Sequence, residues 1–243
     1  MPACTAVEAQ SPAIVIPAAG IGARAGGDRP KQYQCLGNDL LIDVTIDRLA
    51  WALPDAPVMV ALGADDGWWP LTRSAAARHV RTCIGGASRA DSVLAGLRAL
   101  ALPPDRRVLV HDAARPCITP SDIHALLAAA GNDQSGGLLA QSITDTVKEV
   151  DAGGYVVATR ERSRLWRAQT PQLFPGGVLE RALLSANAAG ASVTDEASAV
   201  EHLGCQPLVV PGRADNIKVT QPEDLAMAAW FIEQQRATEG AGR

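Results

Sequence analysis

A glycine-rich stretch near the N-terminus carries two cations, Arg24 and Lys31, within the segment Pro17–Gln32, PAAGIGARAGGDRPKQ. The backbone N–H groups of such a stretch, together with two positive side chains, can wrap a triphosphate. The segment follows a predicted strand, which is where open α/β sheets bind nucleotides. We therefore predict a nucleotide site here, against the alternative of a flexible glycine loop with solvated charges.

This segment differs from two other nucleotide-binding motifs. Gly20, Gly22 and Ala25 fit G-x-G-x-x-[GA], but the dinucleotide fold needs a helix at this point, which two further glycines and Pro30 would break. The segment also lacks the P-loop pattern G-x-x-x-x-G-K-[ST]. The remaining interpretation is a long phosphate-binding loop of another type.

A second group of reactive side chains occurs in Leu109–Pro116, LVHDAARP, at the end of another predicted strand. A carboxylate at a strand end beside a phosphate loop suits Mg²⁺, which takes one or two carboxylates and completes its shell with phosphate oxygens and water. We interpret Asp112 as a metal ligand and Arg115 as a phosphate clamp. The alternative is that Asp112 caps the turn and His111 is a packed core residue.

The elements that must position these residues alternate between strand-like and helix-like periods, which predicts a mostly parallel sheet flanked by helices. The predicted strands are Ala13–Pro17, Pro57–Leu62, Val80–Ile84, Arg107–His111 and Gly137–Ala140. Helical patterns lie between them, near Ile42–Leu53, after the N-cap Ser88 and after the N-cap Thr119. The predicted fold class is α/β.

The second half of the chain departs from this regular alternation. Thr146–Val150 and Tyr155–Ala158, joined by a glycine turn, predict an inserted β-hairpin that serves as a subdomain or a dimerisation arm. The predicted elements after it are the helices Gly176–Asn187 and Asp195–His202, the strands Gln206–Val210 and Ile217–Val219, and a last helix capped by Thr220.

Composition narrows the function classes. The 243 residues include 22 basic and 26 acidic ones, so the net charge of −4 provides no global field for nucleic acid or an anionic membrane. The longest apolar run, Ala13 to Ala23, is too short to span a bilayer, and the N-terminus lacks the basic region of a signal peptide. Five widely spaced cysteines form neither a disulfide framework nor a zinc motif, so we expect a cytoplasmic protein.

Further polar clusters are weak signals individually. They are Gly85-Gly86 with Arg89 and Ser92, QTPQ at 169–172, TDEAS at 194–198 and GRADNIKVT at 212–220. Thr194 by itself reads as an N-cap, and Lys218 by itself as a solvated charge. No Ser-His-Asp, Cys-His or paired-carboxylate arrangement is visible, so nothing else competes for the chemistry.

In combination and in order, six motifs resemble those of the 2-C-methyl-D-erythritol 4-phosphate cytidylyltransferase family of the bacterial non-mevalonate isoprenoid pathway. They are PAAGxGxR, PKQ, HDAARP, TPQ, TDEAS and DNIKVT, and the resemblance runs from about Ala13 to Glu233. It implies transfer of CMP from CTP to methylerythritol phosphate with Mg²⁺, giving 4-diphosphocytidyl-2-C-methyl-D-erythritol and pyrophosphate. It also implies a Rossmann-like nucleotidyltransferase fold with a β-arm that interlocks a homodimer.

The resemblance assigns roles to single positions. The catalytic residues are Arg24 and Lys31. The nucleotide contacts are Ala18, Ala19, Gly20, Gly22, Gly86, Ser92, Ala113 and Lys218. The contacts to the acceptor substrate are Asp112, Arg115, Thr146, Arg162, Thr170, Thr194 and Lys218, with Asp112 also the metal ligand and Arg162 reaching the partner's site. Two positions depart from the family pattern: Ala87 where an acidic residue is frequent, and Arg164 where a glycine is common.

We expect one domain over residues 13–235, an arm at about 141–164, and flexible ends at 1–12 and 236–243. Two other functions remain open at this point. One is a cytidylyltransferase for another polyol phosphate such as ribitol 5-phosphate, which would share the loop and metal residues. The other is a sensor that binds CTP without turnover. TDEAS and HDAARP favour methylerythritol phosphate, and the presence of Arg24, Lys31 and Asp112 together favours catalysis.

Overall fold

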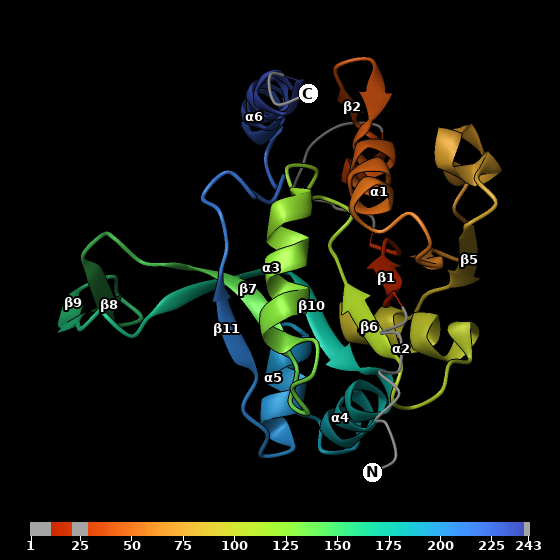
Figure 1. Ribbon diagram of the computed structural model, residues 1–243. Coiled ribbons are helices and arrows are strands. Elements are labelled where there is room, and N and C mark those ends of the chain that lie inside the picture. Colours follow the sequence, from red (N-terminus) through yellow and green to blue (C-terminus); the bar gives the residue numbers. More distant parts are fainter. Residues whose placement is uncertain (1–10, 21–28, 241–243) are drawn as a thin grey trace, which may run out of the picture.

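A seven-stranded sheet forms the centre of the protein, whose computed structural model describes residues 11–20 and 29–240 (Figure 1). The strand order is β11-β7-β10-β6-β1-β4-β5. These strands are β1 (Ala13–Pro17), β4 (Val58–Leu62), β5 (Val80–Ile84), β6 (Arg107–Val110), β7 (Gly137–Ser142), β10 (Trp166–Pro175) and β11 (Leu208–Pro211). All pairings are parallel except those of β10, so the prediction of a mostly parallel sheet is confirmed.

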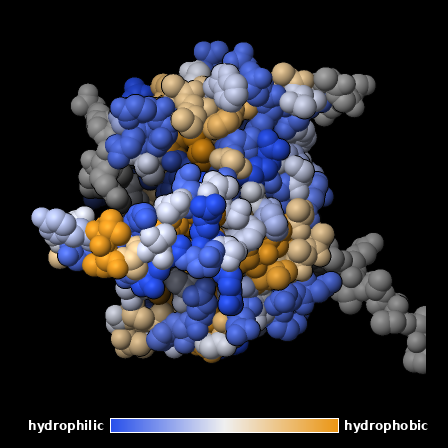
Figure 2. Space-filling model, turned by 90° about the vertical axis from the view of Figure 1, so that its left-hand side faces the viewer, coloured by the Kyte–Doolittle hydropathy of each residue, from blue (hydrophilic) through white to orange (hydrophobic). Residues whose placement is uncertain are grey.

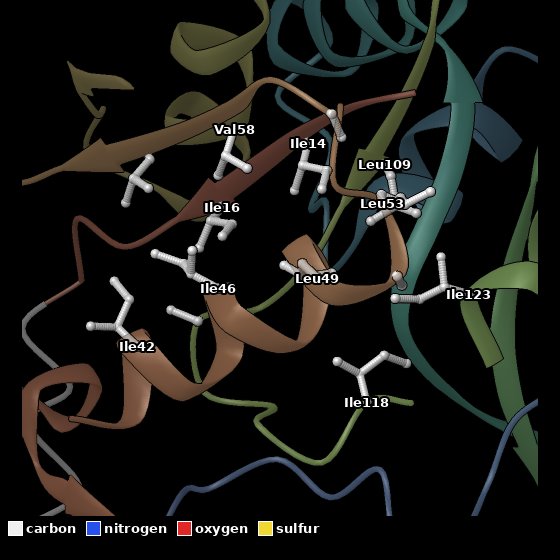
Figure 3. Packing of buried hydrophobic residues seen from close by; sticks show 14 of the residues in the cluster. Ile14, Ile16, Ile42, Ile46, Leu49, Leu53, Val58, Leu109, Ile118 and Ile123 are labelled. Atoms are coloured by element: carbon white, nitrogen blue, oxygen red, sulfur yellow. The ribbon is translucent and has the colours of Figure 1, made fainter. Parts of the chain in front are cut away.

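Helices cover both faces of this sheet. One face carries α1 (Leu41–Ala52) and α3 (Pro120–Ala130), and the other carries α2 (Arg89–Leu100), α4 (Gly176–Ala188) and α5 (Glu196–His202). Side chains alternate across β1, so Ile14 and Ile16 pack against Ile42, Ile46 and Leu49 of α1 (Figure 3). Ala13 and Val15 face the opposite layer. The last helix, α6 (Pro222–Gly240), packs outside α1 through Ala228 and Ile232.

Short elements connect these layers. They are the 3-10 turns η1 (Lys31–Tyr33), η2 (Trp69–Leu71) and η3 (Arg73–Ala76), and the short strands β2 (Cys35–Leu36) and β3 (Asp39–Leu40). The predicted N-caps Ser88 and Thr119 are confirmed, because each forms a capping box with the aspartate three residues later. Within the described part of the chain, no helix combines the length and the apolar character that crossing a membrane requires.

The strand β10 is absent from the sequence-based prediction, although it lies between β6 and β7 and pairs antiparallel with both. Its sequence contains Pro171 and Pro175, which is atypical of an internal strand. The pairing with β7 shifts register between Ala168 and Gln172, and the Thr170–Pro171 peptide bond within this irregularity is cis. The bulge thus accommodates a proline that would otherwise leave a gap in the ladder.

Residues 141–164, called the arm below, contain the antiparallel hairpin of β8 (Val147–Val150) and β9 (Val156–Arg160). The arm projects from the body of the molecule beyond the ends of β7 and β10 (Figure 1). The predicted inserted hairpin is therefore confirmed. Its surface exposes apolar side chains, and Figure 2 shows apolar patches among hydrophilic side chains on this side of the molecule. The exposed apolar residues of the hairpin are Val150, Tyr155, Val156 and Val157.

The end of the chain differs from the prediction in two respects. Residues 217–219 form no strand, because the segment runs past the loop after β6, where Val219 N donates to Ala114 O. The last helix begins at Pro222, and the carboxylate of Asp224 accepts from the backbone N–H groups of Thr220 and Gln221, so Thr220 is not the cap. The helix also continues past residue 235, the predicted end of the domain. The predicted flexible N-terminus falls largely on residues 1–10, outside the described part of the chain.

Candidate active site

A cavity of about 320 Å³, called the first cavity, opens at the carboxyl ends of parallel strands. Gly20 follows β1, Gly86 follows β5 and Asp112 follows β6, and all three line it. Parallel strands end at one edge of the sheet, so loops far apart in the chain meet there. The predicted nucleotide residues that line this cavity are Ala18, Ala19, Gly20, Gly86, Ser92, Ala113 and Lys218.

The start of the glycine loop is held by Gln32. Its buried side-chain amide donates to Ala18 O at 2.9 Å and to Gly20 O at 3.2 Å. These bonds fix the backbone where the chain leaves β1, so the loop starts from a rigid base. Gly22 and Arg24, two of the predicted site residues, lie outside the described residues.

Lys31 lines the first cavity from the turn η1, at the other end of this loop. The turn is anchored by Tyr33, a fully buried residue whose hydroxyl donates to Asp66 Oδ2 at 2.6 Å. The Tyr33 ring stacks on Trp68, and the guanidinium of Arg29 lies 5.1 Å from the centre of the Trp68 ring. This packing fixes the turn that carries Lys31, and the catalytic role of Lys31 stays a prediction.

The Gly85-Gly86 turn faces the glycine loop at close range. A side chain at Gly85 would approach the Cβ atom of Ala19 to 2.7 Å, so only glycine fits there. The Ser92 hydroxyl accepts from Gly86 N at 3.1 Å and donates to Ser88 O at 2.9 Å. Ser92 therefore shapes the turn that borders the cavity, while Ala87, one of the two departures from the family pattern, contributes a small apolar wall.

Asp112 is the electrostatic centre of the site. Its Oδ1 lies 2.9 Å from Arg89 Nη2, its Oδ2 lies 2.8 Å from Lys218 Nζ, and Arg115 Nε is 3.6 Å from Oδ2. Burial opposes the charge on the carboxylate, but these three cations hold the pKa of Asp112 well below its usual range. An ionised carboxylate thus gathers three positive groups at one point.

A second cavity of about 210 Å³ lies on the other side of Asp112. Five of the seven predicted acceptor residues line it: Asp112, Arg115, Thr170, Thr194 and Lys218. Arg89, Asp112 and Lys218 border both cavities and form the wall between them. Two adjoining cavities with a cationic wall fit two anionic substrates that must meet.

Buried hydrogen bonds brace the loop that carries Asp112. Asp112 N donates to Thr170 Oγ1 at 3.0 Å, and Thr170 Oγ1 lies 3.1 Å from His111 Nδ1. His111 Nε2 lies 3.0 Å from Arg115 O. Burial lowers the pKa of His111 to about 4, so the ring is neutral at pH 7 and packs as a structural residue, which was the alternative considered for it.

Two predicted acceptor residues lie away from both cavities. Thr146 and Arg162 are exposed on the arm, and neither borders a cavity of its own chain within the described residues. Arg164, the second departure from the family pattern, is in the turn where Leu165 N donates to Arg162 O. Thr194 borders the second cavity, but the cap of α5 is Asp195, so the interpretation of Thr194 as an N-cap is wrong.

The donors around Asp112 test whether a metal ion fits. Among the described residues, no three His, Cys, Asp or Glu side chains form a metal-binding group. The site therefore does not resemble a dedicated all-protein cage. One carboxylate beside a phosphate-sized cavity does fit Mg²⁺ that arrives with phosphate oxygens as most of its ligands. The role of Asp112 as a metal ligand stays a prediction.

Two residues of the site, Arg89 and Glu196, were not predicted as functional. The guanidinium of Arg89 binds both carboxylate oxygens of Glu196, with Nη1–Oε1 at 2.6 Å, as well as Asp112. Both residues lie in clusters that the sequence shows, GGASR at 85–89 and TDEAS at 194–198. Their pairing has no local signal, because it depends on the juxtaposition of α2 and α5.

This geometry defines the class of the protein. A parallel sheet with a glycine loop at its carboxyl edge, two adjoining cavities and a cationic wall between them is the arrangement of a nucleotidyltransferase. Comparison with known proteins then identifies the family: residues 13–234 match the family model for 2-C-methyl-D-erythritol 4-phosphate cytidylyltransferase. The chain belongs to this family.

Individual relatives align with this chain over nearly its whole length. The chain is 46% identical to the 2-C-methyl-D-erythritol 4-phosphate cytidylyltransferase of Sodalis glossinidius, covering 96% of this chain and 98% of that protein. It is 50% identical to the enzyme of the same name from Pseudomonas aeruginosa, covering 87% and 92%. The solved structure of the Francisella tularensis enzyme matches with a TM-score of 0.77 at 37% identity, covering 90% of this chain and 98% of that chain. A solved 4-diphosphocytidyl-2C-methyl-D-erythritol synthase matches with the same TM-score at 36% identity, covering 90% and 96%.

Proposed function

We propose that this protein transfers CMP from CTP to 2-C-methyl-D-erythritol 4-phosphate, releasing pyrophosphate and forming 4-diphosphocytidyl-2-C-methyl-D-erythritol for isoprenoid precursor synthesis. The observation that carries the proposal is the wall of Arg89, Asp112 and Lys218 between two cavities, in a chain that belongs to this family. The relatives named above are enzymes for methylerythritol phosphate, so this acceptor is favoured over ribitol 5-phosphate.

The first cavity receives the nucleotide. Its floor is the backbone of Ala18–Gly20, which Gln32 holds, and its edge is the Gly86 turn shaped by Ser92. Backbone N–H groups at such loops bind phosphate oxygens, and the turn after β5 borders the base. Lys31 lines the cavity that receives the triphosphate, so we assign to it the stabilisation of the negative charge that develops during transfer.

The second cavity receives the acceptor. Arg115 lines this cavity, and its Nη1 donates to Asn216 O at 2.8 Å, which fixes the guanidinium in place. A fixed guanidinium suits a phosphate group. Thr170 and Thr194 border the same cavity and suit the hydroxyl groups of a polyol. Lys218 borders both cavities and so can contact the acceptor phosphate and the nucleotide together.

The chemistry is dominated by charge. An ionised phosphate monoester oxygen attacks the α-phosphorus of CTP, so the nucleophile needs no strong base. Two anions must approach in line, and the cationic wall lowers the cost of that approach. Lys218, Lys31 and the loop N–H groups then stabilise the charge on the α-phosphate and on the leaving pyrophosphate. Arg24 has the same assigned role by family resemblance.

Asp112 is the residue that would hold a magnesium ion brought with the triphosphate. Such an ion supplies positive charge to the phosphate oxygens when it is bound. Lys218 pairs with Asp112 in this structure, and incoming phosphates compete for the lysine. Loss of that pair frees one carboxylate oxygen beside the first cavity.

We further propose that two chains associate through their arms, which places Thr146 and Arg162 at the acceptor cavity of the partner subunit. Three observations support this arrangement: these residues are exposed, they are not among the residues that line either cavity of their own chain, and the hairpin has an apolar surface. A cytoplasmic location and the absence of nucleic-acid and membrane partners stay predictions.

Pyrophosphate release tests the proposal. CTP is incubated with methylerythritol phosphate, with ribitol 5-phosphate or without acceptor, each with Mg²⁺ and with EDTA. We expect rapid release only with methylerythritol phosphate and Mg²⁺. Faster release with ribitol 5-phosphate would assign another acceptor, and CTP binding without release under all conditions would indicate a sensor.

A further inference from the structure

We propose that Arg89 and Glu196 are a positioning pair, which orients Asp112 and keeps the two substrate cavities in register. Resting on the proposed function, this inference adds two residues to the transfer reaction. The guanidinium of Arg89 binds both carboxylates. Its Nη1 and Nη2 donate to the two oxygens of Glu196 at 2.6 and 3.1 Å, and its Nε donates to Asp112 Oδ1 at 3.0 Å.

The pair joins the two cavities at the level of the backbone. Arg89 is the first residue of α2, directly after the turn that borders the first cavity. Glu196 is the first residue of α5, directly after Thr194 and Asp195, which border the second cavity. A bidentate ion pair between these two helix starts therefore sets the distance between the nucleotide side and the acceptor side.

Burying the charge of Glu196 is unfavourable unless both carboxylate oxygens are bound by a cation. Glu196 is 0% exposed, and both of its oxygens are bound by Arg89. Replacing a buried ion pair by apolar residues is often neutral or stabilising for a fold, so packing alone does not explain why a charged pair stands here. The contact between Arg89 and Asp112 offers the explanation. The guanidinium can orient the carboxylate of Asp112 only while Glu196 binds its two terminal nitrogens.

The start of α5 is anchored independently of Glu196. Asp195 caps the helix with Ser198, Gln172 Nε2 donates to Asp195 Oδ2 at 2.8 Å, and Ala197 N donates to Gln172 Oε1 at 2.8 Å. These bonds tie the helix start to β10. Removing the charge of Glu196 should therefore leave α5 in place and release mainly the guanidinium of Arg89.

A released guanidinium has an alternative partner in the triphosphate beside it. In a Glu196→Gln variant we expect Arg89 to turn toward the phosphates, which leaves Asp112 misoriented at the cavity wall. A misplacement of about 1 Å within an active site can cost about 100-fold in rate. The expected result is a kcat at least about 10-fold lower, together with tighter CTP binding.

The experiment compares Glu196→Gln and Arg89→Lys with Glu180→Gln as a matched control. Glu180 also pairs with an arginine of α2, Arg98, but that pair is exposed and borders neither cavity. For each variant, kcat and both KM values are measured, CTP affinity is measured by calorimetry without acceptor, and thermal unfolding is followed.

We expect Glu196→Gln to lower kcat at least 10-fold and to tighten CTP binding, and Glu180→Gln to match the unsubstituted protein. Arg89→Lys, which keeps one charge but loses the bidentate contact, should lower kcat similarly. Unchanged kcat in a folded Glu196→Gln variant would overturn the proposal, and so would a loss of activity that only follows the unfolded fraction. If Glu196→Gln does not fold, Arg89→Lys decides by the same criteria.

The test is separable from the proposed function. If the unsubstituted protein released no pyrophosphate from CTP and methylerythritol phosphate, the reaction assignment would fail at that step. Calorimetry still tests the pair, because a freed Arg89 should tighten CTP binding in Glu196→Gln and leave it unchanged in Glu180→Gln. Equal affinities in all three proteins, with equal kcat wherever turnover occurs, would refute the pair.

Discussion

Lys218 places its Nζ 2.8 Å from Oδ2 of Asp112 in the wall that the two substrate cavities share. The lysine comes from the segment before the last helix, and the aspartate follows β6. The lysine side chain is 37% exposed and that of the aspartate 9% exposed. The cation is therefore more accessible to a substrate than the carboxylate that binds it. An anionic substrate thus meets a preorganised cation whose counter-charge is part of the site.

Replacing Asp112 by Asn should abolish Mg²⁺-dependent activity and lower stability. The sequence suggests only a small loss of stability, because the amide keeps the shape of the side chain. The structure changes that expectation, since Arg89, Lys218 and Arg115 would lose their shared anion. We expect a loss of about 2 kcal/mol, reduced from the value for a fully buried pair because Lys218 and Arg89 are partly exposed.

Chemical denaturation with and without pyrophosphate checks this expectation. An added polyanion should restore part of the lost stability in Asp112→Asn, because it neutralises the same three cations. Asp47→Asn serves as the control, since Asp47 pairs with Arg73 at the exposed surface and should change little. Wild-type Mg²⁺ dependence in Asp112→Asn would remove the metal assignment.

Replacing Lys31 by Met should remove most turnover and leave the fold intact. Lys31 lines the first cavity from η1, and the hydroxyl of the buried Tyr33 anchors this turn to Asp66. Loss of one group that stabilises developing charge costs about 10²–10³ in kcat. We compare kcat and melting temperature with those of Arg78→Met, which removes an exposed charge away from both cavities. Near-normal kcat in folded Lys31→Met would exclude Lys31 from the mechanism.

The sequence predicts the parts of the site that depend on local signals. The limits of β1 and β5, the capping boxes at Ser88 and Thr119, and the hairpin of the arm all follow from short-range patterns that the structure confirms. The sequence predicts the glycine loop and Asp112 at the ends of two strands, and parallel strands end at one edge of the sheet. These predictions need only the period of the sequence and the topology rule.

The parts that were missed depend on contacts between distant segments. β10 was missed because Pro171 suggests a loop, and only the bulge opposite β7 makes a central strand compatible with it. The pairing of Arg89 with Glu196 was missed because two weak motifs gain meaning only when α2 and α5 are adjacent. The expected strand at 217–219 was wrong because Val219 bonds to the loop at Ala114 instead of to the sheet.

Replacing Thr170 by Val should destabilise the loop that carries Asp112. The Thr170 hydroxyl accepts from Asp112 N and lies 3.1 Å from His111 Nδ1, and both His111 and Thr170 are buried. Valine has a similar shape but leaves these two groups without a partner, which costs about 1–3 kcal/mol. Thr170→Ser keeps the hydroxyl and should recover most of the loss. Urea unfolding of both variants tests this, and equal stability of Thr170→Val and the unsubstituted protein would contradict it.

The cysteines should differ sharply in reactivity. Burial raises the pKa of Cys117 to about 12, and its side chain is fully buried with Sγ 3.6 Å from Ala228 O. Its thiolate is therefore scarce at pH 8, whereas Cys35 is exposed. In a Cys4→Ser background, we expect a thiol reagent to label Cys35 rapidly and Cys117 only after unfolding. A further Cys35→Ser change should remove the rapid phase, and labelling of Cys117 in the folded protein would contradict the burial argument.

Mixing two inactive variants tests whether Arg162 serves the partner's site. Arg162→Ala removes the arm contact and Lys31→Met removes the loop cation, so each homodimer is inactive. If Arg162 acts across the interface, a mixed dimer contains one site with both changes and one with neither, because a two-fold axis makes the contact reciprocal. Subunit exchange should then restore activity to about a quarter of the normal value in an equal mixture, since half of the dimers are mixed and each has one intact site.

The opposite result has an equally clear meaning. If Arg162 acts within its own chain, every site in a mixed dimer carries one lesion and mixing restores nothing. Exchange is verified by mass spectrometry of a mixture in which one variant carries an isotope label, so failure to mix is detected. As a control, Lys31→Met is mixed with Arg181→Ala, an exposed change on α4 outside the arm. This mixture shows how much activity is obtained when the partner of Lys31→Met has an unchanged arm. No recovery with Arg162→Ala after verified exchange, or a monomer by light scattering, would refute the shared site.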